Sequence, residues 1–250
     1  MTTAALDRAD VQIVRLEQLR LSELMDVQKI VCDHLPTPEL YFPVSEPEML
    51  ELLGPDAICF GAQHDGQLVG FFGVLFMGDR PGNVGEDLGL AAQELPLVAY
   101  FKAVNVLPDY RGIGLQERMT TALFAEMGVG GSSATDVDNA HPTPKAPGVP
   151  PFKWLCSTVS PLNVSSLKIF LDHGFWVAGL KPKYLGYQRC LLLRPRWDTK
   201  PKNEGGVVVS LQDYPGQTKL LKSGMVGSLL DCIPHTPKIH YIQGNRQPYE

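Results

Sequence analysis

The stretch Ala103–Met127 constrains the fold more than any other part of this sequence. Residues 97–107 are rich in apolar and aromatic side chains and predict a buried strand. Pro108 cannot donate a hydrogen bond to a strand ladder, so the strand is expected to end there. Apolar residues then recur at helical spacing, at Leu115, Met119, Leu123 and Met127. The sequence therefore predicts a strand, a tight turn and an amphipathic helix.

The turn itself carries two glycines, Gly112 and Gly114, which let the backbone approach a ligand closely. The N–H groups at the start of a helix have no partner within the helix and lie at the positive end of its dipole. Together they form an anion site suited to a phosphate or pyrophosphate, to which Arg111 could add a charged contact. Neither the P-loop pattern nor G-x-G-x-x-G is present, so the turn alone does not identify a ligand.

The rest of the chain alternates strands and helices with turn signals. A capping box at Ser45–Glu48 predicts a short helix, and Asp65-Gly66 predicts a two-residue hairpin turn. Loops are expected at 78–96 and 128–151. Expected strands are 11–16, 57–64, 67–77, 152–159, 175–180 and 184–193, and further helices are 21–35 and 160–173. After Pro195 the composition changes, with short strands expected at 207–211 and 238–243 and a weak helix at 217–222.

Two segments in this order resemble the GNAT superfamily of acyl-CoA-dependent N-acyltransferases. Arg111–Gln116 is similar to the family's pyrophosphate signature Q/R-x-x-G-x-G/A, although Gln116 stands where the family has Gly or Ala. Thr158–Phe175 is similar to the family's later strand, its Asn at a helix start and its helix ending in Gly-Phe. The resemblance covers residues 11–194. It implies an α/β fold with a mixed central sheet, helices on both faces, and a V-shaped opening between strands 97–107 and 153–159.

The same resemblance implies acetyl-CoA, or another acyl-CoA, as co-substrate. The pantetheine arm would pair with the backbone near Val104, Asn105 and Val106, and Asn163 and Ser166 would lie near that arm or the thioester. The pyrophosphate would meet Arg111, Gly112, Ile113, Gly114, Leu115 and Gln116. A simpler interpretation of Asn163 is a helix N-cap. The acceptor is expected to be a primary amine of a small molecule or a peptide.

Catalytic groups do not carry over from the family by residue identity. A Tyr that commonly protonates the leaving thiolate corresponds here to Phe170, and strand 97–107 has no Glu to act as a base. Candidate acids or bases are Tyr100, Asp109, His173 and Tyr184, with a water relay as an equal alternative. The competing interpretation of His173 is a favourable charge at a helix end, and that of Tyr184 is packing. A non-catalytic acyl-CoA sensor is therefore the alternative function.

Composition limits the kinds of partner and the cellular location that are expected. With 22 Lys and Arg against 27 Asp and Glu, the charge of −5 argues against nucleic acid. Five widely spaced cysteines suit a reducing compartment, and the N-terminus lacks a secretory pattern, so a cytoplasmic location is expected. The longest apolar run, 69–77, is shorter than the roughly 20 residues that span a bilayer.

Two features beyond the acyltransferase pattern remain. Cys232, His235 and His240 lack a clear fourth ligand, so no metal site is predicted. Acidic residues of the 78–96 loop are expected to be a solvated surface, with attraction of a cationic amine as the alternative. The expected domain is 1–194, and 195–250 is an extension that packs on it or on a second copy in a homodimer.

Overall fold

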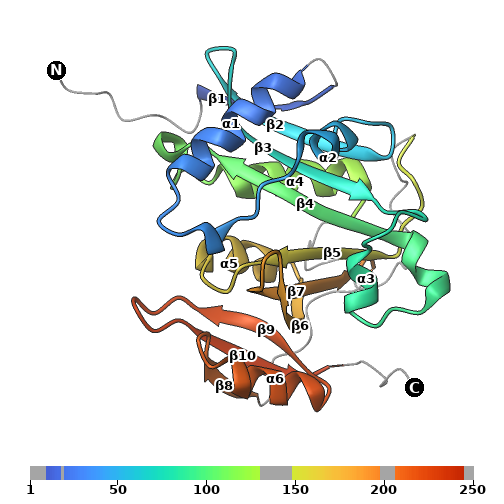
Figure 1. Ribbon diagram of the computed structural model, residues 1–250, viewed down its shortest axis with the longest axis vertical. Helices are drawn as coiled ribbons and strands as arrows, with labels where there is room; N and C mark the ends of the chain where they lie inside the picture. Colours follow the sequence, from blue (N-terminus) through green and yellow to red (C-terminus); the bar gives the residue numbers. More distant parts are fainter. Residues whose placement is uncertain (1–9, 18–19, 130–147, 198–205, 245–250) are drawn as a thin grey trace, which may run out of the picture. The chain divides into compact units, whose positions relative to one another are not determined.

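The computed structural model describes residues 10–17, 20–129, 148–197 and 206–244 (Figure 1). The chain divides into two compact units. Unit 1 comprises Met1–Pro38, Pro43–Phe76 and Phe101–Pro150, and unit 2 comprises Glu39–Phe42, Met77–Tyr100 and Pro151–Glu250. Strand β4 (Val98–Val106) contributes its first residues to unit 2 and the others to unit 1. The expected V-shaped opening remains a prediction.

Unit 1 is a sheet covered by helices on both of its faces. Strands β1 (Val11–Arg15), β2 (Ala57–His64) and β3 (Gln67–Phe76) are antiparallel neighbours, followed by β4. Helices α1 (Leu21–Asp33) and α2 (Glu46–Glu51) lie over the near face in Figure 1, and α4 (Leu115–Met127) lies over the far face. A 3-10 turn, η5 (Pro108–Tyr110), joins β4 to the segment that opens α4.

Local sequence rules account for much of unit 1. Asp65 and Gly66 have φ values of 49° and 75°, as a type I′ hairpin turn requires, and they connect β2 and β3 as predicted. The capping box is confirmed, because Ser45 donates to Glu48 Oε2 from its backbone N (2.9 Å) and from Oγ (2.7 Å). The four residues that predicted an amphipathic helix, Leu115, Met119, Leu123 and Met127, are all buried on α4.

Unit 2 is a second set of strands. Its order is β5 (Trp154–Val159), β7 (Tyr187–Pro195), β6 (Trp176–Lys183), β9 (Met225–Asp231), β10 (Lys238–Gln243) and β8 (Val207–Ser210), paired antiparallel. Helices α5 (Val164–Asp172) and α6 (Tyr214–Lys222) both pack on β6 and β9. The short segments are α3 (Val84–Asp87), η4 (Ala92–Leu97) and η3 (Pro38–Leu40), whose last two residues belong to unit 2.

The structure corrects several predicted boundaries in unit 2. The 78–96 stretch holds α3 and η4 instead of a plain loop, because the Asn83 side chain caps α3 by accepting from the Gly85 N–H (2.9 Å). The helix expected from residue 160 begins at Val164, since Asn163 is its N-cap. The reversal between β6 and β7 lies at 184–186, not at 181–183, and Pro182 pairs with Gln188 within the ladder.

The C-terminal region contains one element that the sequence pattern did not predict. Strands β8 and β10 and helix α6 are close to their expected positions, and β9 is additional. A Cβ on Gly227 of β9 would lie 2.6 Å from the Ile239 side chain, so any larger residue there would force Ile239 to shift. The predicted boundary at residue 194 remains a prediction, and residues 130–147 of the expected 128–151 loop lie outside the described residues.

No helix in the described ranges combines the length and hydropathy needed to cross a bilayer.

Candidate functional site

The turn that opens α4 in unit 1 has the backbone geometry expected of it. Gly112 and Gly114 have φ values of 82° and 77°, in the left-handed region that disfavours residues with a Cβ. A Cβ added to Gly112 would meet no atom within 4 Å, so the backbone angle and not crowding demands glycine there. Gly114 occupies the N-cap position, directly before the buried Leu115. The turn therefore presents open backbone rather than packed side chains.

The polar groups of this turn come mainly from the main chain. The first N–H groups of α4, up to Glu117, have no partner within the helix. Ile113 and Gln116 are half-buried, whereas Arg111 is exposed and donates from Nε to the Val106 carbonyl oxygen (3.2 Å). This contact fixes the guanidinium against the end of β4. The turn can accept an anion on N–H groups, with a cation beside it.

A second contact anchors the turn to the β2–β3 hairpin. His64 Nδ1 and the Tyr110 hydroxyl share a hydrogen bond of 2.9 Å, and their rings meet edge to face at 5.6 Å. Tyr110 immediately precedes Arg111 in the sequence. The turn at 111–116 is thus held from both of its ends, by α4 and by the hairpin.

The predicted pantetheine contacts lie on the last part of β4. Val104 and Val106 are half-buried, and Asn105 between them is 1% exposed. A Cβ on Gly70 of β3 would lie 2.8 Å from the Asn105 carbonyl oxygen, so the absence of a side chain there lets β3 and β4 approach. The Leu107 N–H donates to the Val69 carbonyl oxygen (2.9 Å) and extends this contact beyond the strand.

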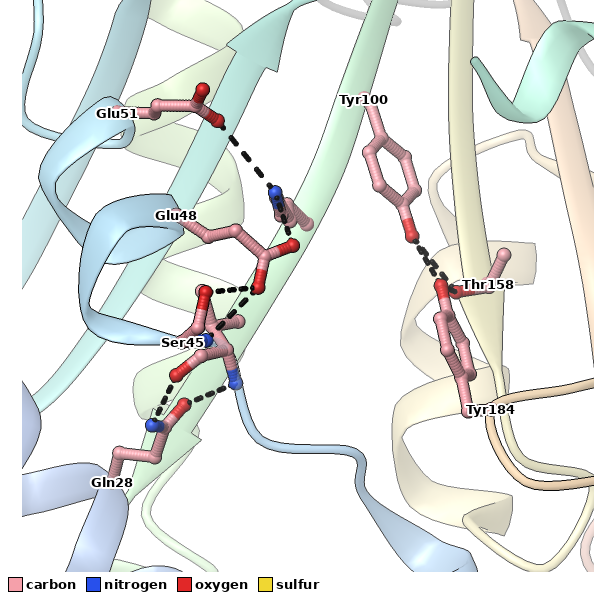
Figure 2. A network of polar contacts seen from close by, with 9 residues as sticks. Gln28, Ser45, Glu48, Glu51, Tyr100, Thr158 and Tyr184 are labelled. Atoms are coloured by element: carbon pink, nitrogen blue, oxygen red, sulfur yellow. Dashed lines mark hydrogen bonds and ion pairs between the residues drawn. The ribbon is translucent and has the colours of Figure 1, made fainter. Parts of the chain in front are cut away.

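Unit 2 brings together two of the four candidate acid–base residues. The Tyr100 and Tyr184 hydroxyls are 3.0 Å apart, and Thr158 Oγ1 lies 3.0 Å from the first and 3.2 Å from the second. Figure 2 shows the two phenol groups pointing toward each other beside Thr158. We call Tyr100, Thr158 and Tyr184 the hydroxyl cluster. Each hydroxyl has one proton and two neighbours, so the three can donate in a closed ring.

The members of the hydroxyl cluster differ in burial. Burial raises the pKa of Tyr100 well above its usual value, and the neighbouring Tyr184 adds to this effect. Tyr100 therefore stays protonated and remains a hydrogen-bond donor. Tyr184 is half-buried, and its ring stacks on Phe42 with centroids 4.9 Å apart. Tyr184 is therefore the cluster phenol that is closer to solvent.

The remaining predicted residues take structural positions. The Asn163 side chain caps α5 by accepting from the Ser166 N–H (3.2 Å), and Ser166 is buried. His173 Nδ1 donates to the Ile169 carbonyl oxygen (2.8 Å), which ties its ring to the end of α5. Asp109 is exposed in η5. None of these positions contradicts a role with a ligand, and none demonstrates one.

Phe170 packs edge to face on Phe175, with centroids 5.0 Å apart, and is 2% exposed. The position at which the family often has a hydroxyl is thus part of an apolar core. Thr158 was not among the predicted acid–base residues. It lies 58 residues from Tyr100 and 26 from Tyr184, and no local pattern links positions so far apart.

A second polar network, in unit 1, also escaped sequence reasoning. Lys102 on β4 forms an ion pair with Glu48 (2.9 Å), and its ammonium lies 3.9 Å from Glu51. Partial burial alone would raise the pKa of Glu48, but hydrogen bonds from Ser45 and Lys102 outweigh it and lower the pKa to about 2. Figure 2 shows the carboxylates of this network on α2. A carboxylate with so low a pKa is a poor general base near neutral pH.

Two acidic residues of the 78–96 stretch are engaged within unit 2. Asp87 accepts from both Lys181 and Lys183, and Glu94 accepts from Lys153 and from Trp154 Nε1 (3.2 Å). These two carboxylates are structural ion-pair partners, so they are not a solvated surface as expected.

The described residues contain no group of three or more His, Cys, Asp or Glu arranged to hold a metal. His240 Nε2 pairs instead with Asp231 (2.7 Å).

Comparison with solved structures places this fold. NAA60 of Arabidopsis thaliana, solved with acetyl-CoA, superposes with a TM-score of 0.50 at 14% identity, covering 74% of this chain and 98% of that one. A GNAT-family acetyltransferase from Streptococcus pneumoniae gives 0.48 at 14%, covering 74% and 98%. The ribosomal-protein-S18-alanine N-acetyltransferase of Escherichia coli gives 0.49 at 17%, covering 78% and 99%. The chain has a GNAT acyltransferase fold, which confirms the fold that the two sequence segments predicted.

Models of protein families give no match to this sequence. A search of curated proteins also gives none.

Proposed function

We propose that this protein is an acyl-CoA-dependent N-acyltransferase that moves an acetyl group from acetyl-CoA to a primary amine of a small molecule or peptide. The observation that carries the proposal is the turn at 111–116. Within a GNAT fold, two left-handed glycines open α4 directly after a buried strand. The structure of NAA60 that shares this fold was solved with acetyl-CoA.

The turn fits a pyrophosphate on physical grounds. Space beside Gly112 is open, and the N–H groups of residues 111–116 include donors that the helix leaves unused. Because main-chain groups do the binding, Gln116 can replace the usual small residue without removing a donor. Val104, Asn105, Val106, Asn163 and Ser166 remain proposed contacts of the pantetheine arm. When bound, acyl-CoA supplies an activated thioester.

The reaction requires one bond to form and one to break. The neutral amine nitrogen bonds to the thioester carbon, the C–S bond breaks, and its electron pair stays on sulfur. We assign Tyr184 as the donor that protonates this sulfur, because its hydroxyl is held by two others and its ring is half-buried. The phenolate then regains a proton that the nitrogen loses, through solvent.

The other two hydroxyls stabilise Tyr184 while its proton is away. Tyr100 remains protonated because burial raises its pKa, so it can donate to the phenolate oxygen across 3.0 Å. Thr158 can donate to the same oxygen across 3.2 Å. Two donors held in place reduce the cost of charge on Tyr184. The hydroxyl cluster thus takes the role that Phe170 cannot perform.

A specific observation favours the alternative of a non-catalytic acyl-CoA sensor. Phe170 is buried against Phe175 and has no proton to give. A sensor would bind acetyl-CoA and CoA but release no CoA in the presence of amines.

Two experiments separate these possibilities. In a thermal shift assay, acetyl-CoA at a hundred times its dissociation constant should stabilise the protein by about 2.7 kcal/mol. The Arg111→Glu variant should lose most of that shift. CoA release across a panel of amines then tests turnover. Stabilisation without release identifies a sensor, and no stabilisation by acetyl-CoA or CoA refutes both functions.

The region 195–250 is proposed to be an extension of the 1–194 acyltransferase domain. Its described part adds three strands and α6 to unit 2, with Val177 paired to Gly227. Sedimentation velocity of the full chain would show whether it also supports a homodimer. A cytoplasmic location and the lack of a nucleic-acid partner remain predictions.

A further inference from the structure

One guanidinium in unit 2 is buried without a matching anion. Arg189 on β7 is 2% exposed. Its Nη1 donates to the Gln188 carbonyl oxygen (2.9 Å), while the buried Nη2 has no hydrogen-bond partner in the described part of the chain. Burial lowers the pKa of this guanidinium, which reflects the cost of holding a charge away from water.

Neighbouring cations on the same hairpin, unlike Arg189, have a carboxylate partner. Lys181, which pairs in register with Arg189, and Lys183 both bind the Asp87 carboxylate. No carboxylate in the described residues lies within ion-pair distance of Arg189. A buried charge is costly unless it is paired, so an unpaired guanidinium indicates a position kept for an anion that arrives from outside.

The surroundings of Arg189 connect it to the hydroxyl cluster. Its guanidinium carbon lies 5.4 Å from the ring centroid of Tyr184 and 6.0 Å from that of Tyr187. These aromatic contacts hold the guanidinium in place but give its Nη2 no hydrogen-bond acceptor. An anion bound at Nη2 would therefore lie near Tyr184, whose hydroxyl we assign as the proton donor.

One short segment packs against Tyr184. Phe42, which stacks on Tyr184, is 40% exposed and belongs to the short segment 39–42. Glu39 in the same segment is exposed, and its negative charge partly offsets the lowering of the Arg189 pKa by burial. Displacing this segment would remove Phe42 from the ring of Tyr184, beside which Arg189 lies.

We propose that the acceptor amine carries a carboxylate and that Arg189 binds this group, which holds the amine beside Tyr184. The inference rests on the proposed acyltransferase function and adds the class of acceptor. A bidentate pair of guanidinium and carboxylate fixes direction as well as distance, so Arg189 would set which amines are acetylated. Arg189 is then a specificity residue and takes no part in proton transfer.

The test compares matched acceptors. CoA release is measured with unbranched aliphatic monoamines of three to six carbons, each beside the ω-amino acid of the same length. For at least one length, the wild type should show a kcat/KM roughly 10- to 100-fold higher for the amino acid, the range expected of a hydrogen-bonded charge. In Arg189→Met this ratio should fall to about one, because the loss in kcat/KM falls on the amino acid and not equally on the plain amine.

Lys181→Met is the matched control, because it removes a neighbouring cation that already has a partner. It should keep the preference. The melting temperature of Arg189→Met should be equal to or above that of the wild type, since replacing an unpaired buried charge by an apolar side chain removes a cost. A purely structural Arg189 would instead lower the melting temperature and weaken both acceptors alike. Equal rates for both acceptors in the wild type, or a preference that survives in Arg189→Met, overturns the proposal.

A binding measurement separates this proposal from the acyltransferase assignment. Calorimetric titration with glutarate, which has carboxylates and no amine, needs no turnover. Binding to the wild type that Arg189→Met abolishes supports the anion site even if no amine is acetylated. In that case the acyltransferase assignment fails while the site stands. Glutarate binding that is absent, or the same in both proteins, refutes the site independently of whether acetyl-CoA binds.

Discussion

The turn at 111–116 in unit 1 and the hydroxyl cluster in unit 2 are built in opposite ways. The turn is contiguous in sequence and relies on backbone angles, at Gly112 and Gly114. The hydroxyl cluster joins side chains separated by up to 84 residues, and each distance depends on how strands pair. A site built from backbone groups should tolerate changes of side chain, whereas a cluster of side chains should tolerate few. Binding and chemistry should therefore respond to mutation very differently.

The largest effect is expected at the hydroxyl cluster. Tyr184→Phe removes the proposed proton donor and should lower kcat by about 10²-fold or more, with the KM for acetyl-CoA unchanged. Tyr100→Phe removes only one supporting donor and should lower kcat by about tenfold. Steady-state kinetics by CoA release measures both. If Tyr184→Phe keeps full activity, the proton comes from another group, and the hydroxyl cluster is only a packing feature.

A mutation in the turn at 111–116 should weaken acetyl-CoA binding and leave the chemical step unchanged. Gly112→Ala forces a Cβ into a left-handed conformation, at a cost of about 1 kcal/mol. It should also weaken acetyl-CoA roughly tenfold by shifting the N–H donors. Gly66→Ala is the matched control, because Gly66 has φ 75° and equally open surroundings but lies in the hairpin turn. Calorimetry and thermal unfolding should give equal stability losses for the two variants and weaker ligand binding for Gly112→Ala alone.

The two units can also be compared by their stability in acid, where a smaller effect of mutation is expected. Each unit has a lysine-paired carboxylate whose folded pKa is depressed, Glu48 in unit 1 and Asp87 in unit 2. A depressed pKa stabilises the folded state above the pKa of the unfolded chain and loses that contribution as pH falls. For Glu48 the loss runs from about pH 4.5 to about 2. Because the Glu48 side chain is 45% exposed, the contribution is about 1 kcal/mol at most.

Urea unfolding at a series of pH values tests this. All three tryptophans, Trp154, Trp176 and Trp197, belong to unit 2, so their fluorescence reports that unit while circular dichroism reports both. Glu48→Gln should reduce the acid-dependent loss of unfolding free energy that circular dichroism measures. Asp87→Asn should reduce the corresponding loss that tryptophan fluorescence measures. Identical pH profiles for wild type and both variants would show that neither ion pair contributes.

The smallest effect is expected from the charge beside the turn. Glu117 lies in the first turn of α4, where its carboxylate favours the helix but repels a phosphate. Glu117→Gln should tighten acetyl-CoA by about twofold at low salt, and the gain should vanish as salt screens the repulsion. Titration at two ionic strengths measures it. An unchanged affinity at low salt would mean that the anion does not bind near this end of α4.

The part of the molecule that sequence could predict is the part set by local backbone rules. The Asp65-Gly66 hairpin, the Ser45–Glu48 capping box and the helix after Gly114 all follow from residues within a few positions of one another. The turn between β6 and β7 was misplaced because Lys181-Pro182-Lys183 resembles a turn. Pro182 instead pairs with Gln188 in the ladder. The reversal begins with Tyr184 and Leu185, which are residue types that do not indicate a turn.

The candidate site was predictable only in part for the same reason. Tyr100 and Tyr184 could be singled out as residue types, but their approach to Thr158 depends on strand pairing that no local pattern encodes. No sequence pattern singled out Arg189, because its distinguishing feature is a buried Nη2 without a hydrogen-bond partner, which only the structure reveals. Strand β9 was missed since Gly227 interrupts its apolar pattern, although a larger residue there would crowd the Ile239 side chain.

The reversal at 184–186 has a consequence for how this protein would respond to selection. Tyr184, Leu185 and Gly186 follow one another with φ values of 45°, 66° and 91°, and only the last is a glycine. Left-handed backbone costs a residue with a Cβ about 1 kcal/mol or more, so Leu185→Gly would relieve strain at an exposed position. Tyr184→Gly would relieve a similar strain, but it would also remove the ring stacked on Phe42 and the hydroxyl contacts with Tyr100 and Thr158. A library screened only for heat resistance would therefore enrich replacements at Leu185 and retain Tyr184, so selection for stability alone would preserve the proposed proton donor.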